Sequence, residues 1–181
     1  MKRNLNYITF GLFIVMLLSS CIKEDVKSFT GEPVIEFDAT VLNSATTPYS
    51  YHVAVRTPPF AIPTTTANSV PINRSLATPV RLRVNLVGPQ RNTDEVITFR
   101  VLTDVTPTAP NMLAVAGTHY NITGTTFTIP ANSSFGEVVI NIVNPGVSST
   151  NPREVHLELV GNSNLKPSEN YKRVGVRIAQ N

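Results

Sequence analysis

The 181-residue chain has no tryptophan, one cysteine and three histidines. A single cysteine excludes an intramolecular disulfide, and a catalytic thiol at Cys21 would need a base partner that nothing beside it suggests. The histidines His52, His119 and His156 lack the close spacing of a zinc site. Sheets can bring distant histidines together, but exposed strand positions are the simpler interpretation. The lone cysteine therefore needs another explanation.

The sequence also lacks the motifs of common enzyme classes. It contains no Gly-x-Ser-x-Gly elbow and no glycine-rich phosphate loop. A glycosidase needs two carboxylates facing a cleft, whereas Glu137, Glu154 and Glu158 alternate with apolar residues and are expected to point outward. His156, between the last two, is expected on the same solvated face. The expected partners of these acids are the outward arginines Arg81, Arg83, Arg100, Arg173 and Arg177. We therefore expect no catalytic activity.

The cysteine follows a short apolar run near the start of the chain. Two basic residues precede residues 8–18, ITFGLFIVMLL, a run shorter than the roughly 20 residues that span a bilayer. The motif LSSC that follows resembles a bacterial lipobox. The resemblance implies cleavage between Ser20 and Cys21, which makes residues 1–20 a lipoprotein signal peptide, and acylation of Cys21, which anchors the chain in a membrane. The alternative is an uncleaved transmembrane anchor with an incidental cysteine.

The residues behind Cys21 indicate where the anchor places the chain. Residues 22–25, IKED, resemble the surface-export signal of Bacteroidota outer-membrane lipoproteins, with an ordinary charged tether as the alternative. We expect residues 21–32 to form a lipidated tether on an outer membrane, facing the cell exterior. Loss of Lys2 and Arg3 with the signal peptide leaves thirteen basic and twelve acidic residues. This balance gives no electrostatic footprint for nucleic acid.

The remainder, residues 33–181, shows strand patterns and no long stretch with apolar residues at helical spacing. Apolar and polar residues alternate, which indicates antiparallel strands with one packed face and one solvated face. The predicted strands are residues 33–38, 51–57, 80–86, 96–102, 138–143, 154–160 and 171–179. Phe99 and Leu157 are among the residues expected in the core, and Tyr51, Val53 and Val55 are expected to share a face. We predict one antiparallel, immunoglobulin-like β-sandwich of seven to eight strands, with a small barrel as the alternative.

One segment, residues 57–79, interrupts the alternation with five prolines and many threonines and serines. Proline cannot donate to a sheet ladder, and loops of this length are uncommon in single domains unless they serve a function or are disordered. Because Phe60, Ile62, Val70 and Ile72 are apolar, we expect the segment to pack along the sandwich as a strap. A ligand-contacting loop and a disordered segment are the alternatives.

The stretch from residue 114 to residue 143, AVAGTHYNITGTTFTIPANSSFGEVVINIV, resembles Calx-β-like domains. These domains carry an Ala-x-x-Gly-x-Asp-Tyr turn, a short strand, a second turn and a strand of alternating valine and isoleucine. The matching residues are Ala114, Gly117, Tyr120, Ile129, Pro130, Ala131 and Ser133. The chain departs from the pattern at His119, where aspartate is usual, and at Asn132, where glycine is frequent. A related pattern marks small Bacteroidota lipoproteins whose genes often accompany glycan-import systems. The resemblance implies the sandwich fold, with Tyr120 buried between the sheets.

Two functions of different classes fit these features. The first is a non-catalytic binding accessory that takes a glycan or another extracellular ligand beside an outer-membrane import complex. The second is a structural or assembly module that contacts other surface proteins through its sheet edges. Glycan platforms usually expose aromatic side chains, so Tyr49, Tyr51 and Phe60 are the candidate ligand contacts.

We expect no cofactor and no metal ion, although the name of the resembling family is tied to calcium. Calcium needs six to eight oxygen ligands, largely from clustered carboxylates, and the acids of this chain are dispersed. His119 replaces the turn aspartate of the family pattern and cannot ligate calcium. A partial site from Asp94, Glu95 and Asp104 is the alternative.

Overall fold

The structure, a computed structural model, describes residues 29–39, 42, 44–58 and 69–181. The predicted signal peptide, Cys21, most of the tether and Phe60 lie outside these residues. No helix among the described residues is long and apolar enough to cross a membrane. All strands belong to the unit Gly31–Asn181. In chain order they are β1 (Val34–Phe37), β2 (Val53–Ala54), β3 (Val80–Val87), β4 (Glu95–Leu102), β5 (Met112–Leu113), β6 (Tyr120–Asn121), β7 (Thr126–Ile129), β8 (Phe135–Ile142), β9 (Arg153–Gly161), β10 (Lys166–Pro167) and β11 (Arg173–Ile178).

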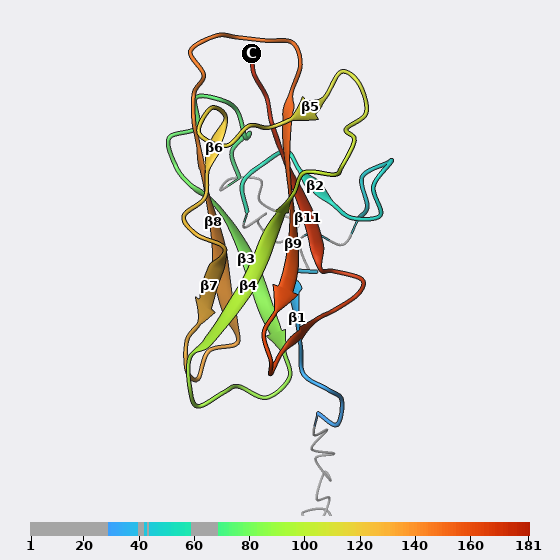
Figure 1. The fold of residues 1–181 in the computed structure, drawn as a ribbon, viewed down its shortest axis with the longest axis vertical. Coiled ribbons are helices and arrows are strands. Elements are labelled where there is room, and N and C mark those ends of the chain that lie inside the picture. The colour runs from blue at the N-terminus through green and yellow to red at the C-terminus, as the bar shows by residue number, and fades with distance from the viewer. Residues whose placement is uncertain (1–28, 40–41, 43, 59–68) are drawn as a thin grey trace, which may run out of the picture. The chain divides into compact units, whose positions relative to one another are not determined.

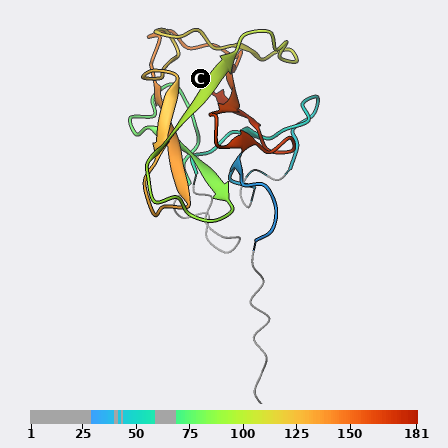
Figure 2. The ribbon, with the colours of Figure 1, turned by 60° about the horizontal axis from the view of Figure 1, so that its bottom comes forward.

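The strands form two sheets that pack face to face (Figure 1). Sheet one has the order β10-β1-β3-β8-β6, and sheet two has the order β2-β11-β9-β4-β7, with β5 joined to β9. The long strands pair antiparallel, and Figure 2 shows orange β8 and red β11 on opposite sides of the sandwich. The predicted all-β sandwich is confirmed. The described residues form eleven strands and not the expected seven to eight, because β5, β6, β7 and β10 are two to four residues long, too short for alternation to reveal them.

The predicted register of the long strands is confirmed by the side chains that lie between the sheets. Phe99 is 2% exposed and Leu157 is fully buried. The core also contains Ile35, Phe37, Val80, Leu82, Val84, Leu86, Ile97, Val138, Ile140, Val155, Leu159, Val174, Val176 and Ile178. One expectation was wrong: Val55 does not share a face with Tyr51 and Val53, because β2 ends at Ala54 and Val55 is 49% exposed.

The described end of the proline-rich segment packs against the sandwich. The Ile72 amide donates to the Val55 carbonyl, the Ala179 amide donates to the Ile72 carbonyl, and Ile72 is 1% exposed. This part of the predicted strap is therefore confirmed. Val70 is exposed and does not contribute to the packing, and Phe60 and Ile62 lie outside the described residues.

The two turns of the Calx-β-like stretch have the backbone geometry that their residues suggest. Gly117 has a φ of 78° and Asn132 a φ of 60°, a left-handed region that glycine and asparagine tolerate best. The Val115 amide donates to Nδ1 of His119 at 3.0 Å, so histidine supplies the side-chain acceptor in this turn. Tyr120 is buried, as predicted.

Candidate functional site

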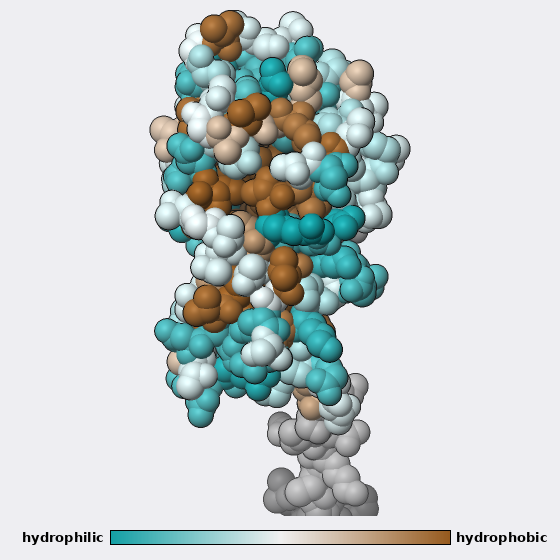
Figure 3. Space-filling view, viewed as in Figure 1, coloured by the Kyte–Doolittle hydropathy of each residue, from teal (hydrophilic) through white to brown (hydrophobic). Residues whose placement is uncertain are grey.

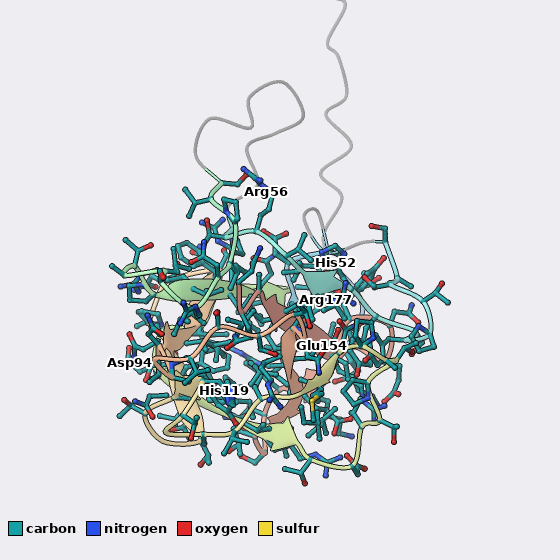
Figure 4. The ribbon with its side chains drawn as sticks, turned by 90° about the horizontal axis from the view of Figure 1, so that it is seen from above. His52, Arg56, Asp94, His119, Glu154 and Arg177 are labelled. Atoms are coloured by element: carbon teal, nitrogen blue, oxygen red, sulfur yellow. The ribbon has the colours of Figure 1, made fainter. Side chains whose placement is uncertain are left out.

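The outer face of sheet two brings polar side chains of three strands into rows. In register, Arg100 of β4 lies opposite Glu158 of β9, and Glu158 lies opposite Arg173 of β11. Two residues along each strand, His156 lies opposite Gly175. A further step brings Glu154 opposite Arg177, and Figure 4 labels this last pair. Alternation alone produces these rows, because every second side chain of a strand points to the same face.

The rows of His156 and Glu154 are covered by residues 44–54, which we call the tyrosine flap. The hydroxyl of Tyr49 donates to Oε2 of Glu154 at 2.5 Å, and the hydroxyl of Tyr51 lies 3.1 Å from Nδ1 of His156. The two tyrosine rings stack at a centroid distance of 5.3 Å. Nε of Arg177 donates to Oε1 of Glu154 at 2.7 Å from the other side. The flap therefore closes a buried polar network over β9.

A tight turn holds the flap, and a glycine makes room for it. The Thr46 amide donates to the Tyr51 carbonyl, and the Thr46 hydroxyl accepts from the Val53 amide at 2.9 Å. β2 then pairs with β11 beside Gly175. A Cβ at Gly175 would lie 2.8 Å from Val53 Cγ2 and 3.0 Å from His156 Nδ1. Only glycine lets the flap and the histidine approach the strand this closely.

The network sets the protonation of its carboxylate and its tyrosines. Burial alone would raise the pKa of Glu154, but its contacts with His156, Tyr49 and Arg177 outweigh that effect and lower the pKa to about 2. His156 Nε2 lies 3.2 Å from Oε2 of Glu154, within ion-pair distance but without the alignment of a hydrogen bond. Burial raises the pKa of Tyr49, and the bond to Glu154 raises it further. Glu154 is thus ionised and Tyr49 protonated at neutral pH.

These positions correct several sequence-based expectations. Glu154, His156 and Glu158 were expected on a solvated face, but they are 0%, 0% and 7% exposed. Tyr51 was expected to be free for a ligand and is 8% exposed, whereas Tyr49 is half-buried. The flap covers Glu154 and His156, whereas each carboxylate oxygen of Glu158 is bound by an arginine, Arg100 or Arg173. The pairing of the acids with outward arginines is confirmed at Arg81, Arg100, Arg173 and Arg177. Arg83 instead lies over the ring of Phe135 at 4.2 Å.

Below the flap, the row of Arg100, Glu158 and Arg173 stays open, and Figure 3 shows a hydrophilic band crossing β4, β9 and β11. Nε of Arg100 donates to Oε2 of Glu158 at 2.7 Å, and Nε of Arg173 donates to Oε1 at 3.0 Å. Burial opposes ionisation of Glu158, but the two guanidinium groups outweigh it and lower its pKa. The arginine side chains remain 57% and 41% exposed, while that of Glu158 is 9% exposed.

Three adjoining hollows run from this row past the flap, and together they form what we call the side trough. The first, about 470 Å³, is lined by Arg100, Glu158, Leu159, Val160, Pro167, Glu169 and Lys172. The second, about 300 Å³, is lined by Ser50, Tyr51, Glu169, Asn170, Lys172 and Arg173. The third, about 220 Å³, is lined by Leu42, Ala45, Ser50, Tyr51, His52, Asn170, Tyr171 and Arg173. Neighbouring hollows share lining residues, so they adjoin one another along the turn of residues 168–172.

Sequence reasoning found Tyr51 at this site but missed the turn that forms the opposite wall. Glu169, Asn170 and Lys172 follow a proline in a polar stretch, which marks a turn without showing what the turn faces. Nothing in the sequence indicated that Gly175 makes room for the flap. Phe60 lies outside the described residues.

The other candidate residues do not converge on one centre. Figure 4 shows Asp94 and His119 apart from His52. Asp94 accepts from the Ala131 amide at 2.8 Å, and Glu95 accepts from the Asn162 side chain at 2.8 Å. Among the described residues, no three histidine, cysteine, aspartate or glutamate side chains come close enough to hold a metal ion. The expectation that calcium plays no part stays a prediction.

No protein-family model matches the chain, and no curated protein matches it in sequence. Among solved structures, the apo form of the Calx CBD1 domain superposes with a TM-score of 0.53 at 11% identity, over 83% of this chain and 99% of that one. The fold is similar to that of the Calx CBD1 domain. The predicted fold resemblance is thereby confirmed, and an identity this low says nothing of a ligand.

Two further structures are more distant. The CBD12 structure from CALX1.2 has a TM-score of 0.46 at 14% identity, over 60% of this chain and 40% of that chain. A candidate carbohydrate-binding protein from Bacteroides ovatus has a TM-score of 0.47 at 8% identity, over 81% of this chain and 37% of that chain. The chain therefore spans well under half the length of either protein.

Proposed function

We propose that this chain is a non-catalytic binding module of the cell surface, anchored through Cys21 to an outer membrane, and that the side trough takes a glycan. The observation that carries the proposal is that the three hollows of the trough adjoin one another. It places amide, hydroxyl and charged groups of Ser50, Asn170 and Arg173 along one path beside the Tyr51 ring. A long shallow path lined by hydrogen-bonding groups suits a polymer better than a small apolar ligand, which favours an enclosed pocket.

The absence of catalysis belongs to the same proposal. Glu154 and His156 are side chains of the kind that act as acid or base catalysts, but both are fully buried under the flap. The carboxylate of Glu158 has each oxygen bound by an arginine. None of the three has the access to a bound substrate that an acid or base catalyst needs.

The alternative, assembly through sheet edges, has less support from the described strands. Three of the four edge strands, β2, β6 and β10, are two residues long, and edges this short offer few free backbone groups for an added strand. β7 is the longest of the four edge strands, at four residues.

The test is a glycan array probed with the full chain in detergent. Asn170→Ala, in the trough, should reduce binding to any glycan that the chain takes. The matched control is Asn121→Ala, an exposed asparagine of β6 outside the trough, which should leave binding unchanged. Failure of the folded chain to bind any glycan, or equal loss in both variants, would refute the proposal.

A further inference from the structure

We propose that the ligands of the side trough are acidic glycans, and that their carboxylate groups bind Arg100 and Arg173 above Glu158. This inference rests on the proposed function and specifies its ligand class. It starts from the arrangement of charge in the open row: two guanidinium groups share one carboxylate. The row thus keeps a net positive charge of one.

A ligand can reach the two arginines of the row more easily than their shared carboxylate. The side chain of Glu158 is 9% exposed, whereas those of Arg100 and Arg173 are 57% and 41% exposed. Each arginine donates to Glu158 through Nε and has Nη2 within ion-pair distance of the same carboxylate. Among the described residues, neither Nη1 has a hydrogen-bond partner, so each guanidinium retains donors for an incoming anion.

The buried carboxylate also orients the two arginines before a ligand arrives. Because Glu158 holds Nε of Arg100 at 2.7 Å and Nε of Arg173 at 3.0 Å, the two guanidinium groups converge from neighbouring strands without further loss of side-chain freedom. Such preorganisation reduces the entropy that binding would otherwise cost. It also fits a planar, charged oxygen acceptor better than a neutral hydroxyl.

One residue of the trough opposes an acidic ligand. Glu169 is an exposed acid that pairs with Lys172 at 2.6 Å, and both line the two hollows next to the open row. Lys172 compensates for Glu169, so the excess positive charge stays with the arginines. Removal of the Glu169 charge should therefore strengthen binding of an acidic glycan and leave binding of a neutral one unchanged.

The experiment compares sugars that differ only in charge. Oligosaccharides of pectic galacturonate, alginate and hyaluronan are titrated into the full chain in detergent by calorimetry, each beside its carboxyl methyl ester. A panel of neutral glycans is tested in parallel. We expect at least one uronate oligomer to bind about tenfold more tightly than its ester, because charge-assisted bonds to the arginines are lost on esterification. The affinity should fall as sodium chloride is raised, since salt screens exposed charges.

Three variants test whether the arginines of the open row bind the carboxylates of the ligand. Arg100→Ala should weaken uronate binding about tenfold, and Glu169→Gln should strengthen it. Arg81→Ala is the matched control, because Arg81 is also paired with a glutamate and its side chain is 55% exposed, but on the outer face of sheet one. It should leave binding unchanged. Circular dichroism verifies that each variant is folded.

The outcomes separate this inference from the proposed function. If methyl esters or neutral glycans bind as well as the uronates, the acidic preference is wrong and the glycan-binding role stands. Equal loss of binding in Arg81→Ala and Arg100→Ala would overturn the assignment of the charge to the open row. If neither acidic nor neutral glycans bind the folded chain, both proposals fail.

Discussion

The two outer faces of the sandwich carry similar pairs of arginine and glutamate, yet water reaches them very differently. On sheet one, the side chains of Arg81 and Glu137 are 55% and 34% exposed and lie 3.1 Å apart. On sheet two, those of Arg177 and Glu154 are 27% and 0% exposed and lie 2.7 Å apart. The tyrosine flap accounts for the difference, because it adds a layer to part of one face only.

Pairs of arginine and glutamate on an outer sheet face can therefore have different effects, depending on whether they are solvated or covered. A solvated ion pair contributes little to stability, whereas a covered pair strongly penalises the loss of either partner. On sheet two, the covered rows hold the flap and the open row of Arg100, Glu158 and Arg173 faces the trough. The flap thus separates the covered rows, which we expect to stabilise the fold, from the open row, which we propose binds a ligand.

The largest expected effect comes from neutralising the covered acid. Glu154→Gln should reduce the free energy of unfolding by about 3 kcal/mol, because it leaves Arg177 and His156 without their charged partner in a buried network. Glu137→Gln, the same change on the open face, should cost less than about 1 kcal/mol. Urea denaturation measures both. Equal losses would show that the flap does not isolate Glu154 from water.

Acid should reduce stability through the same network. The folded-state pKa of Glu154 is about 2, below its ordinary value of 4.5, and that of Glu158 is also lowered. A depressed pKa contributes stability that is present above the unfolded-state value and lost as pH falls through the folded-state value. For Glu154 this amounts to about 3 kcal/mol.

We therefore expect the unfolding free energy to decline from about pH 5 toward pH 2. Glu154→Gln should flatten this decline, and Glu137→Gln should not. A decline of the same size in the Glu154→Gln variant would assign the acid sensitivity to other carboxylates.

The sequence allowed the register of the long strands to be predicted, but not the tyrosine flap that covers part of the outer face of sheet two. Alternation reports which face a strand residue takes, so Phe99 and Leu157 were placed correctly in the core. It does not report what packs on the outer face, and Tyr49 and Tyr51 reach β9 from 105 positions away in the chain. The trough was hidden for the same reason, because its walls come from the flap and from a turn more than a hundred residues later.

Gly175→Ala tests whether the flap depends on the close approach of Val53 and His156 to the backbone of β11. The added methyl group would press on Val53 and His156, and overpacking of this kind costs about 1–3 kcal/mol. The flap should loosen as a result, which near-ultraviolet circular dichroism can detect, since the chain has five tyrosines and no tryptophan. An unchanged tyrosine signal together with unchanged stability would show that the flap does not depend on this glycine.

The smallest expected effect concerns the hydroxyl groups that hold the flap down. Tyr49→Phe removes a hydrogen bond to a charged group and should cost about 1.5 kcal/mol, whereas Tyr51→Phe removes a bond to an imidazole nitrogen and should cost about 1 kcal/mol. The Tyr49 hydroxyl is also one of the groups that lower the pKa of Glu154. Tyr49→Phe should therefore weaken the loss of stability between pH 5 and pH 2, because the folded-state pKa of Glu154 moves back toward its unfolded value. The Tyr51 hydroxyl bonds His156 and not the Glu154 carboxylate, so Tyr51→Phe should lower stability by a similar amount at every pH in that range. Parallel pH profiles for the two variants would show that Glu154 owes its low pKa to Arg177 and His156 alone.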